Sequence, residues 1–129
     1  MDATILVIEE SLDLCRLFEY MLRADGHTVF TFHDWQSAQP VLITHAPDLI
    51  IFDWSIANMA GYSWAESVRR ALNTAHIPIL FVCSDPPSRA TSEMIANAGI
   101  ALIEKPFDIF MFRNRVAALL GTRERTAGA

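Results

Sequence analysis

The sequence lacks several features that would point to other classes of protein. It has only two cysteines, Cys15 and Cys83, without disulfide or metal-ligand spacing, which fits a reduced cytoplasmic protein better than a disulfide scaffold. Its formal net charge of −5 argues against direct nucleic-acid binding, because phosphate contacts need a basic patch. Its longest apolar runs, such as residues 77–83, are too short to cross a bilayer. Neither a glycine-rich phosphate loop nor a Ser-His-Asp arrangement is present.

What the sequence does contain is typical of one globular domain. The chain has 129 residues, enough to bury a hydrophobic core, and its 52% apolar content excludes a disordered chain. The first ten residues, MDATILVIEE, carry no basic segment before a short apolar run, so they do not form a signal peptide. We therefore expect a soluble, single-domain, cytoplasmic protein with no membrane partner.

Short apolar runs alternate with amphipathic segments along the chain. The runs at residues 4–8, 49–52, 77–83 and 101–103 are typical of strands buried on both faces, and residues 29–32 suit a sheet edge. Helices are expected after the N-cap residues Ser11 and Asp34, with Pro40 inside the second, and over residues 63–75, 88–98 and 108–120. This order predicts a single doubly wound α/β domain with a five-stranded parallel sheet. Residues 122–129 are expected to fray or to begin a linker.

Charged residues stand at the carboxyl ends of the predicted strands. The first strand ends in Glu9 and Glu10, the third in Asp53, and Lys105 follows the fifth. Taken singly, each is an ordinary turn or loop residue. Because the carboxyl ends of parallel strands form one edge where ligands bind, we expect them to converge. Converging carboxylates repel one another unless a hard cation such as Mg²⁺ is present, and a nearby lysine suits a bound anion. Together they predict a site that handles a phosphoryl group.

Four segments carry a resemblance to a known family. They are, in order, ILVIEES, PDLIIFDWSIANMAG, IPILFVCS and ALIEKPF. Over residues 3–120 the chain resembles the receiver domain of two-component response regulators. The resemblance implies the flavodoxin-like strand order 2-1-3-4-5 and a receiver domain over residues 1–121. It also implies a phosphoacceptor protein rather than a metabolic enzyme.

The resemblance assigns the acceptor and the metal ligands. Asp53 would take a phosphoryl group from a phosphohistidine on a histidine kinase or phosphotransfer protein. Mg²⁺ would be held by Glu10, Asp53 and the backbone carbonyl of Ser55, with Glu9 behind Glu10.

Lys105 would pair with a phosphoryl oxygen, and the bond to Pro106 is a candidate cis peptide. The acid pair Glu9-Glu10 departs from the family pattern, which usually has at least one aspartate, and so do the two switch positions. Cys83 stands where a threonine or serine is usual, and Leu102 where an aromatic residue is common. Because a thiol is a weaker donor than a hydroxyl, we predict that Asp53 can be phosphorylated while the hydroxyl–aromatic switch does not operate.

Two questions stay open at this point. The departures also suit a pseudo-receiver, an interaction module that works through fixed contacts without phosphorylation. In addition, the last helix already has an inward-facing apolar stripe, which cannot include all of Ile109, Phe110 and Met111. They would widen the buried face, lie as scattered surface residues, or form the homodimer contact that related receivers use.

Overall fold

The computed structural model describes residues 2–85 and 87–128, with side chains for all of these except 55–59 and 122–128. Within this part of the chain, five strands alternate with five helices, as predicted. The elements are β1 (Thr4–Ile8), α1 (Leu12–Ala24), β2 (Thr28–Phe32), α2 (Trp35–His45), β3 (Leu49–Asp53), α3 (Trp54–Arg70), β4 (Ile79–Cys83), α4 (Arg89–Asn97), β5 (Ala101–Glu104) and α5 (Ile109–Gly128).

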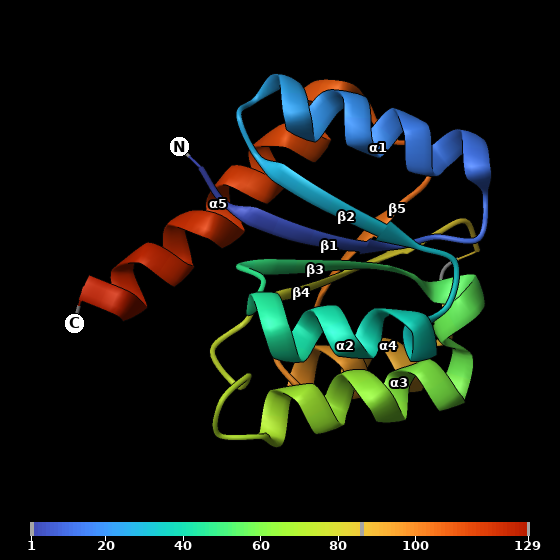
Figure 1. Ribbon diagram of the computed structural model, residues 1–129. Coiled ribbons are helices and arrows are strands. Elements are labelled where there is room, and N and C mark those ends of the chain that lie inside the picture. The colour runs from blue at the N-terminus through green and yellow to red at the C-terminus, as the bar shows by residue number, and fades with distance from the viewer. Residues whose placement is uncertain (1, 86, 129) are drawn as a thin grey trace.

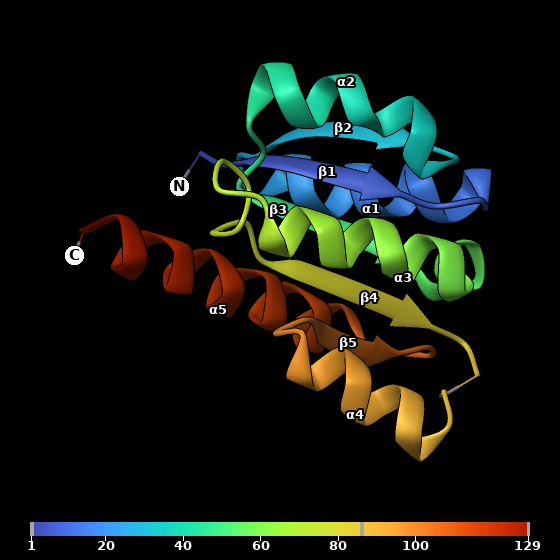
Figure 2. The same ribbon diagram turned by 90° about the horizontal axis from the view of Figure 1, so that it is seen from below.

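The strands form one parallel sheet in the order β2-β1-β3-β4-β5, which confirms the predicted order 2-1-3-4-5 (Figure 2). The less apolar strand β2 lies at one edge of the sheet, where its outer backbone groups and side chains are accessible to water. The strand order reverses between β1 and β3, so the carboxyl ends of these two strands flank the topological switch point.

Helices cover both faces of the sheet, α1 and α5 on one and α2, α3 and α4 on the other (Figure 1). Successive strand residues point to opposite faces. Thus Leu6 and Ile8 of β1 pack in the cluster with α2–α4, while Ile5 and Val7 pack in the cluster with α1 and α5. Burial on both faces explains why the runs are apolar throughout. Among the described residues, no helix is long and apolar enough to cross a membrane.

Two helix boundaries differ from the prediction. Helix α3 begins at Trp54, directly after β3, and ends at Arg70, whereas the sequence predicted residues 63–75. The residues after Asp53 contain no proline and no glycine before Gly61, so nothing in them breaks a helix. Helix α5 continues to Gly128, past the predicted end at residue 120. The tail is rich in helix-forming arginine, glutamate and alanine.

Arg69 ties the end of α3 to two neighbouring connections. Its guanidinium donates to the carbonyl oxygens of Ala75 and Ile77, at 3.2 and 3.3 Å, and of Ala98, at 3.3 Å. Gly99 follows in the left-handed region, with φ of +76°, and a Cβ there would lie 2.6 Å from Arg69 Nη2. Only glycine meets both constraints without strain.

We expect Gly99→Ala to lower the free energy of unfolding by about 1–2 kcal/mol, the cost of a left-handed L-residue, plus any cost of displacing Arg69. The matched control is Gly121→Ala in α5, where a Cβ meets nothing within 4 Å. That change should raise the free energy by about 0.5–1 kcal/mol, because alanine favours helix. Denaturant unfolding measures both, and equal effects of the two substitutions would contradict this account.

Candidate functional site

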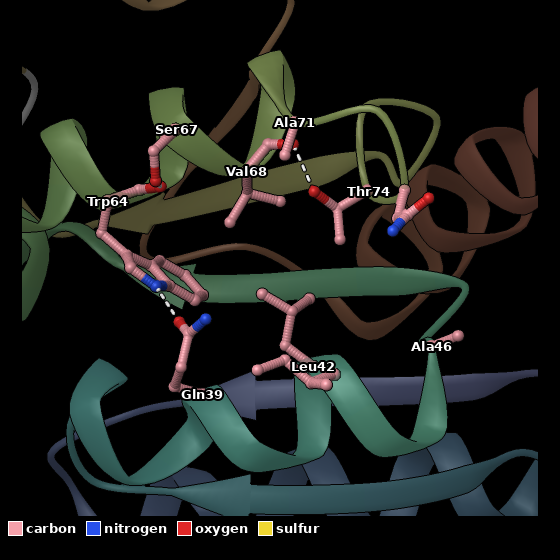
Figure 3. A pocket seen from close by; sticks show the side chains of 10 residues that line it. Gln39, Leu42, Ala46, Trp64, Ser67, Val68, Ala71 and Thr74 are labelled. Atoms are coloured by element: carbon pink, nitrogen blue, oxygen red, sulfur yellow. Dashed lines mark hydrogen bonds between the residues drawn. The ribbon is translucent and has the colours of Figure 1, made fainter.

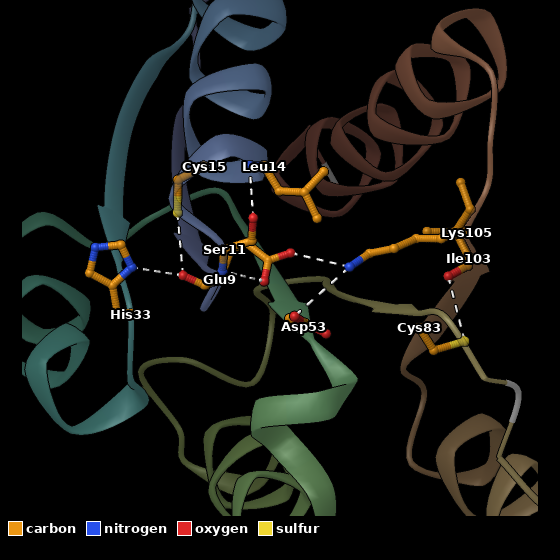
Figure 4. A network of polar contacts seen from close by, with 9 residues as sticks. All are labelled: Glu9, Ser11, Leu14, Cys15, His33, Asp53, Cys83, Ile103 and Lys105. Carbon is orange, nitrogen blue, oxygen red and sulfur yellow. Dashed lines mark hydrogen bonds and ion pairs between the residues drawn. The ribbon is translucent and has the colours of Figure 1, made fainter.

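The ends of β1 and β3 place two carboxylates side by side. Ile8 pairs with Phe52 across these strands, so Glu9 and Asp53 occupy the next positions along the two neighbouring strands. Among the described residues, they are the only charged side chains that are buried, at 1% and 5% exposure. The prediction that the strand ends would bring Glu9 and Asp53 together agrees with this geometry (Figure 4).

Lys105 reaches both carboxylates from beyond β5. Its Nζ lies 3.3 Å from Glu9 Oε1 and 3.9 Å from Asp53 Oδ2. The Lys105 amide donates to the Cys83 carbonyl at 2.7 Å, which fixes the start of the loop against β4. The bond between Lys105 and Pro106 is cis, as expected from the sequence.

The pKa of the Glu9 carboxyl is raised to about 7, mainly by burial and then by the hydrogen bond to Asp53 and the negative charge of Asp53. The Lys105 charge and the Ser11 amide, which donates to Glu9 Oε2 at 3.3 Å, act in the opposite direction. One ammonium group therefore does not fully compensate two buried carboxylates near neutral pH. A further positive charge close to Glu9 and Asp53 would therefore be favourable.

The other predicted metal ligands lie differently. Glu10 is exposed, and the described residues contain no group of three or more His, Cys, Asp or Glu side chains that could hold a metal ion. Ser55 lies in the first turn of α3, where a backbone carbonyl normally accepts from the amide four residues on. Two carboxylates nonetheless fit Mg²⁺, which is commonly bound by one or two carboxylates with water completing its shell.

The two switch positions, Cys83 and Leu102, both make contacts on or beside β5. The Cys83 thiol is buried and donates weakly to the Ile103 carbonyl at 3.8 Å, on the β5 side (Figure 4). Burial raises the pKa of this thiol, and the negative charges of Glu104 and Asp53 add to the effect, so it stays protonated. Leu102 is partly buried and packs against the core beneath α2–α4.

Two residues that support Glu9 were missed in the sequence. The Glu9 carbonyl oxygen accepts a hydrogen bond from the Cys15 thiol at 3.3 Å and another from His33 Nδ1 at 2.9 Å. His33 directly follows β2, so its position at a carboxyl end of the sheet was a usable signal. Cys15 faces Glu9 from the first turn of α1, and no spacing rule distinguishes it from an ordinary core residue.

A series of aromatic rings leads away from the site. Trp54, the residue after Asp53, lies 5.4 Å from Phe81 between ring centroids. Phe81 lies 5.8 Å from Phe52, which lies 5.5 Å from Trp64. All these separations are typical of favourable aromatic pairs. The rings connect the edge that carries Asp53 to the space between α2 and α3.

A parallel sheet of order 2-1-3-4-5 with an acidic pair at its switch point defines a flavodoxin-like α/β domain. Comparison with known families then gives a direct assignment. The model of the response regulator receiver domain matches residues 5–117, and the chain belongs to this family of two-component signalling domains.

Individual relatives agree with this family. The chain is 28% identical over 116 residues to the phosphate regulon transcriptional regulatory protein PhoB of Rhizobium meliloti (strain 1021), covering 90% of the chain and 51% of PhoB. It spans about half or less of the length of the first curated relatives it matches.

Solved structures show the same fold. The solution structure of a response regulator protein from Burkholderia multivorans is 28% identical, with a TM-score of 0.74, covering 92% of this chain and 95% of that one. The chemotaxis response regulator CheY4 of Vibrio cholerae is 21% identical, with a TM-score of 0.80, covering 92% and 99%.

The raised pKa of Glu9 predicts a pH-dependent stability in the absence of divalent cations. The folded state favours protonated Glu9, so this contribution is complete below pH 4.5 and is lost as the pH rises through about 7. Glu9→Gln, which cannot ionise, should therefore gain stability relative to the unchanged protein between pH 4.5 and 7. Urea unfolding in EDTA measures the difference, and a difference that is constant with pH would contradict the assignment.

Proposed function

We propose that this receiver domain accepts a phosphoryl group on Asp53 from a phosphohistidine of a histidine kinase or phosphotransfer protein. The observation that carries the proposal is the position of Lys105, whose ammonium lies 3.9 Å from Asp53 Oδ2 and 3.3 Å from Glu9 Oε1. A purely structural ion pair would need one acid only. The second acid, and the position of the three side chains at the switch point, favour a site that binds a charged ligand.

The transfer step uses Asp53 as the nucleophile. One carboxylate oxygen attacks phosphorus, the bond from phosphorus to the donor nitrogen breaks, and its electron pair stays on the imidazole. An acyl phosphate on Asp53 results. The Lys105 ammonium, 3.9 Å from Asp53 Oδ2, supplies positive charge beside the attacking carboxylate.

Lys105 then changes partners. Its side chain is 20% exposed, so the ammonium has freedom to move from Glu9 to an oxygen of the new phosphoryl group. We further propose that Mg²⁺ is held by Asp53, Glu9 and Glu10 with the Ser55 carbonyl, where it would offset the charge of the phosphoryl oxygens.

Incubation with acetyl phosphate and Mg²⁺ should add one phosphoryl group to the protein, as read by intact mass. Asp53→Asn should abolish the gain, because an amide is not a nucleophile at phosphorus. Asp85→Asn is the matched control, since Asp85 is an exposed acid beyond the neighbouring strand β4. Absence of a gain, or an equal gain in Asp53→Asn, would leave the pseudo-receiver as the better description.

The apolar start of α5 supports a second proposal, self-association. Ile109, Phe110 and Met111 are 52%, 76% and 53% exposed, so the expectation that they widen the buried face is wrong. Phe110 and Met111 line a surface depression together with Arg115 and Ala118. Three adjacent exposed apolar side chains favour a contact between two copies of the domain.

Phe110→Glu should shift sedimentation of the phosphorylated or beryllofluoride-bound domain toward the monomer, because a charge at the centre of an apolar contact cannot be paired. Leu72→Glu is the matched control, since Leu72 is 96% exposed on the connection after α3. A monomer at all concentrations before mutation would contradict the proposal.

A further inference from the structure

A cavity lies between α2 and α3, away from the acidic crevice. Its volume is about 320 Å³, at the lower end of the usual range for small-molecule sites, about 300–1,000 Å³. Both helices run back along the sheet, so their C-terminal ends lie at the edge opposite Asp53 (Figure 1). The lining residues are Gln39, Leu42, Ile43, Ala46, Trp64, Ser67, Val68, Ala71, Asn73 and Thr74 (Figure 3).

None of the lining residues carries a charge. A charged ligand would lose its hydration without gaining an ionic partner here, which is costly. The cavity therefore selects against anions and cations. Leu42 and Val68 face each other across it and offer an apolar surface (Figure 3).

Three polar side chains of the cavity, those of Gln39, Ser67 and Thr74, have hydrogen-bonding directions fixed by their partners in the protein. Trp64 Nε1 donates to Gln39 Oε1 at 2.6 Å. An indole N–H can only donate, so the Gln39 oxygen must face it, and the amide nitrogen is turned toward the space between the helices (Figure 3). Gln39 thus presents donors to a ligand.

Two hydroxyls offer the complementary function. The Ser67 hydroxyl donates to the Trp64 carbonyl at 2.6 Å, and the Thr74 hydroxyl donates to the Val68 carbonyl at 2.7 Å. Each hydroxyl has one proton, which these bonds use, so its oxygen is left to accept.

We propose that this cavity binds a small uncharged molecule that carries a carboxamide on an apolar ring. The ligand carbonyl accepts from the Gln39 amide, and the ligand N–H donates to the hydroxyl oxygen of Ser67 or Thr74. The ring packs between Leu42 and Val68. Asp53 takes no part in this site, so the proposal stands independently of phosphorylation.

Three probes of nearly equal shape test the charge selection: benzamide, benzoate and benzamidine. Titration of ¹⁵N-labelled protein should show benzamide shifting the Trp64 indole N–H signal, assigned with Trp35→Phe and Trp54→Phe. Benzoate and benzamidine at the same concentration should leave it unchanged. No shift with benzamide, or equal shifts with all three probes, would overturn the proposal.

Gln39→Glu tests the directional argument. A glutamate oxygen still accepts from Trp64, while the donors are replaced by a negative charge. Benzamide affinity should fall roughly three- to tenfold, as expected for one lost hydrogen bond, and benzamidine should now bind. Gln36→Glu on the exposed side of the same helix adds the same charge and should change neither affinity.

A steric variant keeps the test decisive if Gln39→Glu disturbs folding. Ala71 is exposed and lines the cavity, so Ala71→Phe should fill the opening and abolish the benzamide shift. Ala117→Phe, at an exposed position of α5, is the matched control and should bind as before. Benzamide binding that survives Ala71→Phe unchanged would place the ligand elsewhere and overturn the proposal.

Discussion

Two buried carboxylates that share one ammonium group are the constraint on which the rest of the structure depends. Burying Glu9 and Asp53 costs free energy, and Lys105 and the Ser11 amide offset only part of it. The parallel sheet makes the arrangement possible, because the register of β1 and β3 fixes the two acids as neighbours. The apolar strands behind them supply the stability that tolerates this cost.

The negative charge of Glu9 and Asp53 is only partly offset by Lys105, which suits a site that binds charged ligands. Apolar side chains at these positions would be the more stable choice for a purely structural edge. The Cys83 thiol donates to the Ile103 carbonyl of β5 and Leu102 packs against the core, and the sequence-based prediction that these residues do not form the usual switch stays a prediction. The aromatic rings from Trp54 to Trp64 lie on the other side of β3 and β4, toward α2 and α3. The acidic crevice and the surroundings of Trp64 are therefore connected by packed side chains, and Cys83 contacts the crevice through its carbonyl, which accepts from the Lys105 amide.

Much of the fold followed from the sequence, because strands buried on both faces give uninterrupted apolar runs and their carboxyl ends share an edge. That reasoning placed Glu9, Asp53 and Lys105 together. It failed after Asp53, where the helix was expected to begin only at residue 63, although the residues themselves favour a helix. It also missed His33 and Cys15, whose bonds to the Glu9 carbonyl depend on how β2 and α1 pack rather than on any local pattern. The cavity beside Trp64 could not be predicted for the same reason, because it depends on how α2 and α3 pack.

The central claim is that Lys105 leaves Glu9 for a phosphoryl group on Asp53. A crystal structure with Mg²⁺ and beryllofluoride, which stands in for the phosphoryl group, tests it most directly. We expect beryllofluoride bonded to an Asp53 oxygen, the Lys105 ammonium on a fluoride, and a longer distance between Lys105 and Glu9. Asp53 without beryllofluoride under saturating conditions, with Lys105 still paired to Glu9, would contradict it.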